Sequence, residues 1–87
     1  MATFVIVAVA PNATLDQNIV DSYASTSLRL SPTVCLVAEK GVTSQEVSLK
    51  LGVKPEGISG VIIFKIESYY GLASQNIWEW IKVKGAE

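Results

Sequence analysis

The stretch that decides the fold is Thr3–Ala10, which reads T-F-V-I-V-A-V-A. Every position in it is β-branched or apolar, and Pro11 and Asn12 end the run. A strand with one face in water alternates apolar and polar residues, whereas a run that is apolar on both faces is typical of a central, covered strand. We therefore expect this strand inside a sheet, with other parts of the protein packed on both of its faces.

The rest of the chain predicts a regular alternation of helices and strands. Thr43 and Glu46 have the spacing of a capping box, in which each residue's side chain bonds the other's backbone N–H at the start of a helix. Leu15, Ile19 and Tyr23 recur at helical spacing. After the first strand we expect a helix over Leu15–Tyr23, capped by Thr14. One bent strand or two short strands follow from Leu28, with the second piece over Thr33–Glu39. The remaining elements are a helix from Thr43 to Leu51, a strand over Val61–Glu67 and a helix over Gln75–Lys82 capped by Ser74.

This order predicts an α+β fold in a single domain spanning residues 1–87. A strand, helix, strand, strand, helix, strand succession is the βαββαβ ferredoxin-like arrangement, here followed by a C-terminal helix. The expected fold is an antiparallel sheet with two helices on one face. The other face would still carry the second apolar row of the first strand, so either the last helix or another subunit should cover it.

Composition favours another subunit. Only 17% of the 87 residues are charged, against about 25% in ordinary soluble domains. We therefore expect a homo-oligomer, most simply a dimer, since dimer interfaces commonly bury about 1,200–2,000 Å².

Several functions are disfavoured by what the sequence lacks. It has no histidine and a single cysteine, Cys35, so one chain offers no serine–histidine or cysteine–histidine pair, internal disulfide or thiolate zinc site. Seven basic and eight acidic residues leave no basic footprint for nucleic acid. No apolar run reaches the 18 residues of a membrane span, and no basic segment precedes the first apolar run as in a signal peptide. We expect a cytoplasmic protein with no cofactor or metal site, and we favour a non-enzymatic role.

The chain resembles the short ferredoxin-like proteins related to the CRISPR-associated small nuclease subunit. The resemblance rests on element order and on five segments: Phe4–Val9, Thr33–Ala38, the capped helix Thr43–Leu51, Val61–Glu67, and Tyr70-Gly71 with the tryptophan-bearing Ile77–Ile81. It implies a metal-dependent nuclease or a nucleic-acid-binding relative as the alternative function.

One departure from that family bears on the implied chemistry. Its catalytic members are expected to carry an aspartate at the end of the first strand, one from each subunit, to hold a divalent metal. Here the strand ends Val9-Ala10-Pro11-Asn12, without a carboxylate, and Asp16 suits the N-terminal turn of the following helix. The resemblance therefore does not carry the nuclease residues onto this chain.

The candidate contact residues are aromatic: Tyr69, Tyr70, Trp78 and Trp80. They could form a stacking platform for nucleobases, but such platforms accompany a positive groove, and we favour the interpretation that they fill the core or an interface.

The remaining candidates favour structural roles. Nothing in the sequence marks Glu67 and Glu79 as an acid–base pair, and Cys35 lies among Val34, Leu36 and Val37 as a small buried residue. A small-molecule site between the sheet and the last helix stays open, although no cluster of polar residues points to one.

Overall fold

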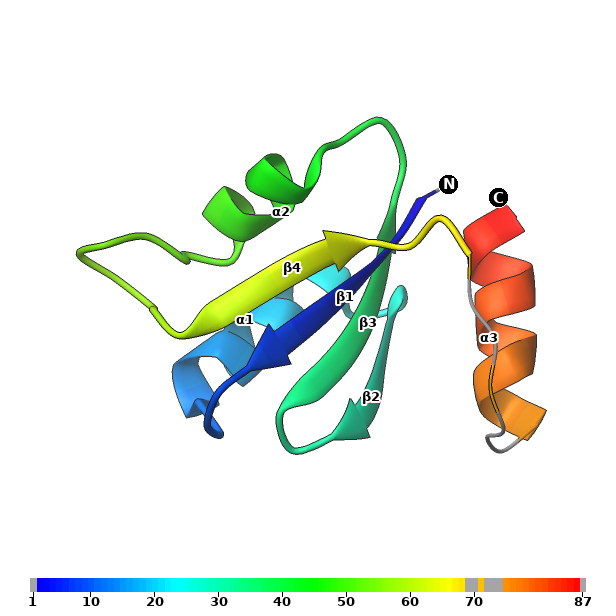
Figure 1. Ribbon diagram of the computed structural model, residues 1–87, viewed down its shortest axis with the longest axis horizontal. Helices are drawn as coiled ribbons and strands as arrows, with labels where there is room; N and C mark the ends of the chain where they lie inside the picture. The colour runs from blue at the N-terminus through cyan, green and yellow to red at the C-terminus, as the bar shows by residue number, and fades with distance from the viewer. Residues whose placement is uncertain (1, 69–70, 72–74, 87) are drawn as a thin grey trace.

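The computed structural model describes residues 2–68, 71 and 75–86, which form a four-stranded antiparallel sheet and three helices. The strand order is β2-β3-β1-β4, which is compatible with a ferredoxin-like fold. In Figure 1, α1 lies behind the strands, α2 lies above them and α3 stands to their right. In chain order the elements are β1 (Ala2–Ala8), α1 (Ala13–Tyr23), β2 (Ser27–Ser31), β3 (Val34–Glu39), α2 (Ser44–Lys50), β4 (Val61–Lys65) and α3 (Gln75–Ala86).

The first strand is central, as its sequence predicts. β1 pairs with β3 on one side and with β4 on the other, both antiparallel. It ends at Ala8, two residues before the predicted end, because β4 begins opposite Ala8 and β3 begins opposite Val7. Val9 therefore lies beyond both neighbouring strands, and its side chain is 83% exposed.

The main hydrophobic core lies between the sheet and the two helices α1 and α2. Phe4 and Ile6 of β1 are fully buried in it, and the alternate residues Cys35 and Val37 of β3 join them. This alternation is that of a strand with one row of side chains packed on helices. The core residues are Phe4, Ile6, Ala8, Leu15, Ile19, Tyr23, Cys35, Val37, Val47 and Leu51.

The start of α2 confirms the predicted capping box. The Thr43 hydroxyl accepts from the Glu46 backbone N–H at 3.1 Å, and the Thr43 N–H donates to the Glu46 carboxylate at 3.0 Å. The helix is followed by Gly52, whose φ of +82° is the left-handed conformation that glycine adopts most easily at a helix end.

The start of α1 corrects the prediction that Thr14 caps it. The cap is Asn12, whose side-chain oxygen accepts from the Leu15 N–H at 2.9 Å. Asn12 has the extended backbone of a capping residue, and Thr14 already lies inside the first turn. Asparagine and threonine both favour this position, so the sequence alone allowed either.

Other element ends also differ from the prediction. β4 stops at Lys65 rather than Glu67, and α3 continues to Ala86 rather than ending at Lys82. The predicted cap Ser74 lies outside the described residues.

Candidate interaction surface

The face of the sheet turned away from α1 and α2 is here called the second face. Strand register places its side chains, because residues directly opposite each other in neighbouring strands point to the same side. Val5 pairs with Leu36 on β3 and with Phe64 on β4, and Leu36 pairs in turn with Leu28 on β2. The second face comprises Thr3, Val5, Val7, Leu28, Ser31, Val34, Leu36, Ala38, Ile62 and Phe64, none of which is charged.

Helix α3 covers one end of this face. Thr3, Leu36 and Ala38 are buried yet do not belong to the main core, and Ile81 of α3 is buried too. α3 contacts β1, so we place these buried residues where α3 packs on the sheet. The sequence left open whether the last helix or another subunit covers the second face. The last helix covers only part of it.

One buried polar group at this end of the second face lacks a hydrogen bond. Among the residues that the structure describes, the buried Thr3 hydroxyl has no hydrogen-bond partner. Leaving a buried hydroxyl unpaired costs about 1–3 kcal/mol. The packing of α3 on the sheet thus buries an unpaired hydroxyl, a cost that we do not find in the described part of the chain where α1 and α2 pack on the other face.

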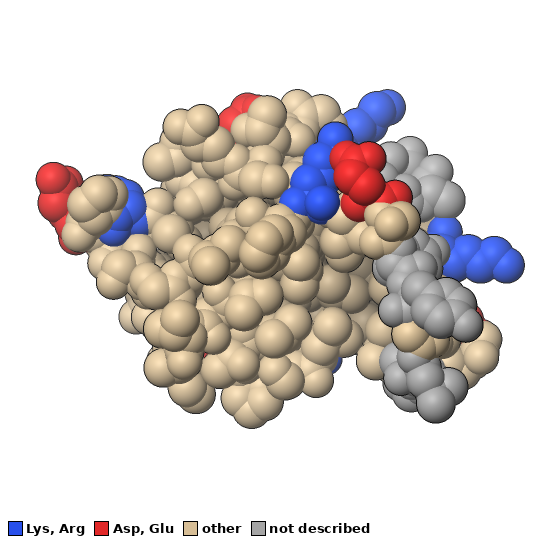
Figure 2. Space-filling view, viewed as in Figure 1, with Lys and Arg blue, Asp and Glu red and all other residues tan. Residues whose placement is uncertain are grey.

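The apolar rest of the second face stays accessible and is here called the open patch. Phe64 is 52% exposed and Ile62 is 57% exposed. In the orientation of Figure 1, where α1 lies behind the sheet, the surface in front of the central strands shows no charged side chain at its centre, and the charges lie around it (Figure 2). The open patch consists of Val5, Val7, Leu28, Val34, Ile62 and Phe64, none of them fully buried.

The aromatic residues singled out from the sequence fall in two groups. Tyr69 and Tyr70 lie outside the described residues. Trp78 and Trp80 lie on α3, where both are half-buried. The residues that sequence reasoning passed over are Ile62 and Phe64, although their alternation in β4 already placed them on one face.

The weighed acid–base and thiol candidates occupy ordinary positions. Glu67 is exposed, and Glu79 accepts from the Gln75 side chain one turn earlier on α3, at 3.3 Å. Cys35 is buried in the main core, as predicted, and burial raises the pKa of its thiol, which lowers its reactivity. Within residues 2–68, 71 and 75–86, no group of three or more His, Cys, Asp or Glu residues could hold a metal ion.

A polar network closes the rim of the helix-covered face. The Tyr23 hydroxyl donates to one Glu39 oxygen at 2.5 Å, and the Lys50 ammonium donates to the other at 3.1 Å while lying over the Tyr23 ring. Burial and the bond to Glu39 raise the pKa of Tyr23, whereas the bonds from Tyr23 and then Lys50 lower the pKa of Glu39. These opposite shifts keep the phenol neutral and the carboxylate charged, so the network ties α1 and α2 to the end of β3 without offering a proton.

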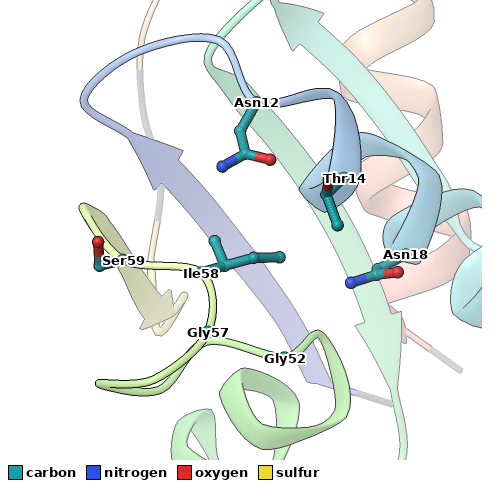
Figure 3. Close-up of a pocket in the computed structure, with 7 residues that line it drawn as sticks. All are labelled: Asn12, Thr14, Asn18, Gly52, Gly57, Ile58 and Ser59. Carbon is teal, nitrogen blue, oxygen red and sulfur yellow. The ribbon is translucent and has the colours of Figure 1, made fainter.

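An open cleft of about 550 Å³ lies between α1 and the loop before β4. Two of its polar side chains already have structural partners, since Asn12 caps α1 and the Asn18 amide donates to the Leu51 carbonyl at 2.9 Å. Figure 3 shows these two residues facing Ile58 across the cleft. None of its lining residues titrates near neutral pH: they are Asn12, Thr14, Asn18, Gly52, Gly57, Ile58 and Ser59. The cleft therefore offers shape but no catalytic group.

Comparison with known proteins gives no assignment. No protein-family model matches the chain, and no curated protein matches it. Among the helices of the described part of the chain, none combines the length and apolar character needed to cross a bilayer.

Proposed function

We propose that this protein is a non-enzymatic ferredoxin-like module that self-associates through the open patch. The fold assignment is supported by the strand order β2-β3-β1-β4 and by the two helical crossovers, α1 between β1 and β2 and α2 between β3 and β4. A βαββαβ chain of the ferredoxin-like kind has these connections. The module is then completed by α3 on the second face.

The observation that carries the proposal is the open patch. It extends over all four strands and contains no charged side chain, and its two β4 residues are more than half exposed. Ser31 of β2 is a polar residue beside it, opposite Val34. Contiguous apolar surface of this kind on a soluble protein marks an interaction site. Since the patch lacks charge, it offers nothing to a nucleic-acid backbone, and an equally apolar surface is the partner that it fits.

A second copy supplies such a surface, and the size of the patch sets the strength of the association. Four strands about 4.8 Å apart and five residues long outline roughly 20 by 17 Å. This is less than the roughly 800 Å² per partner of a standard interface, so we expect a weak dimer whose population depends on concentration.

Light scattering coupled to size exclusion tests the proposal with two matched variants. Phe64→Ser removes an apolar side chain from the open patch, and Leu49→Ser removes one that is 61% exposed on α2, away from the patch. The wild type and Leu49→Ser should show a mass that rises above 9.3 kDa with concentration, and Phe64→Ser should stay monomeric over the same range. A wild type that stays at 9.3 kDa throughout, or equal behaviour of the two variants, would contradict the proposal.

A further inference from the structure

The two edges of the sheet are built differently. At the β2 edge the register shifts between Arg29 and Ser31, and Pro32 follows directly. Arg29 also pairs with Asp16 of α1 at 2.6 Å. Bulges, prolines and charges are the features by which proteins prevent edge strands from pairing with other strands.

The β4 edge has little of this protection. The strand reads V-I-I-F-K, and the register with β1 is regular along its whole length. Only Lys65, at its end, is charged. β-Branched and aromatic residues without proline are the sequence type that pairs most readily as a strand.

Hydrogen bonding shows which backbone groups of β4 remain unpaired. Ile66 donates to the Thr3 carbonyl, and Val9 donates to the Gly60 carbonyl, each at 2.9 Å. Because hydrogen-bonded pairs alternate along an antiparallel ladder, the backbone groups of Ile62 and Phe64 also point to β1. Those of Val61, Ile63 and Lys65 point away from the sheet, and no hydrogen bond from the described residues reaches them.

We infer that β4 pairs antiparallel with β4 of a second copy, about a two-fold axis at Ile63. The inference rests on the proposed self-association and names the strand through which it occurs. This register is the one that pairs all five residues, so the N–H and C=O groups of the three outward-pointing residues find partners. Lys65 then lies opposite Val61 of the partner subunit, which avoids placing two like charges opposite each other.

The same register brings together the two most exposed residues of the strand. Ile62 lies opposite Phe64 of the partner subunit, and Phe64 lies opposite Ile62 of the partner subunit. Both side chains are on the second face, where cross-strand pairs of aromatic and β-branched residues are favourable. The two sheets become one sheet of eight strands, in which the two open patches lie side by side on the same face and only Ile62 and Phe64 gain contacts across the axis.

Disulfide formation between single-cysteine variants tests this register. In a Cys35→Ser background, which removes the one native cysteine, Ile62→Cys and Phe64→Cys proteins are mixed in a glutathione redox buffer and weighed by mass spectrometry. Opposite residues that do not share hydrogen bonds lie about 4.5 Å apart at Cα, within the range that a disulfide can bridge. Two copies of residue 62, or two of residue 64, are diagonal neighbours about 7–8 Å apart, beyond that range.

The expected result is that the mixed 62–64 disulfide exceeds the half share of random pairing, with little disulfide in either protein alone. Random pairing, or a preference for like pairs, in a wild type that forms dimers would overturn the β4 register and leave self-association standing. A wild type that stays monomeric in the light-scattering experiment would overturn both.

Discussion

The two phenylalanines of this chain lie on opposite faces of the same sheet. Phe4 on β1 is fully buried beneath α1 and α2, whereas Phe64 on the neighbouring β4 is 52% exposed on the second face. Phe4 lies in a core whose rim is closed by the hydrogen bonds of Glu39 with Tyr23 and Lys50. Phe64 belongs to a face that one helix covers at one end only. Identical side chains thus serve folding on one face and are available for association on the other.

The largest effect on the free energy of unfolding should come from the face of the sheet that α1 and α2 cover. Phe4→Ala should lower the free energy of unfolding by about 3–5 kcal/mol, because it removes a large side chain from a tightly packed core. Chemical denaturation followed by tryptophan fluorescence measures it. A loss below about 1 kcal/mol would mean that this face is not the main core.

The polar rim of the covered face should show a smaller, pH-dependent effect. Glu39→Gln should cost about 1 kcal/mol at neutral pH, because it weakens the bonds from Tyr23 and Lys50. Folding lowers the pKa of Glu39, so this stabilisation is present above the ordinary glutamate value of 4.5 and is lost as the pH falls through the folded pKa. Urea denaturation of both proteins from neutral to acidic pH tests it. A difference that stays constant with pH would contradict this role of the carboxylate.

The covered end of the second face should respond in the opposite direction. Thr3→Val keeps the side-chain shape and removes the unpaired buried hydroxyl, so it should stabilise the protein by about 1 kcal/mol. Thermal unfolding monitored by circular dichroism tests the sign. Destabilisation would show that the Thr3 hydroxyl has a partner when α3 is in place.

The smallest effect on folding should come from the open patch. Phe64→Ala should change the free energy of unfolding of the monomer by no more than about 0.5 kcal/mol, as is usual for exposed positions. The measurement is made by denaturation at dilution low enough to keep the chain monomeric. A loss comparable to that of Phe4→Ala would erase the difference between the two faces.

Much of this fold follows from local sequence patterns. The apolar run of β1, the capping box at Thr43 and the burial of Cys35 were each predicted, because each depends on neighbouring residues only. The alternation in β4 likewise placed Ile62 and Phe64 on one face. The choice of Asn12 over Thr14 as a cap could not be predicted, since both side chains suit that position.

The candidate site was less predictable because it depends on how far α3 reaches. Helical spacing in Ile77, Trp78 and Ile81 shows that this helix has an apolar side, but not which part of the sheet it covers. Sequence reasoning therefore selected aromatic residues, of which Trp78 and Trp80 are half-buried on α3 and Tyr69 and Tyr70 lie outside the described residues. The exposed residues Ile62 and Phe64 emerge only when strand register and burial are combined.

The central claim is that the chain self-associates through the open patch, and sedimentation equilibrium of the wild type tests it most directly. Over roughly 5 to 500 µM, a range suited to small and weak interfaces, the average mass should rise from 9.3 kDa towards twice that value. A mass that stays at 9.3 kDa at every concentration would contradict the account.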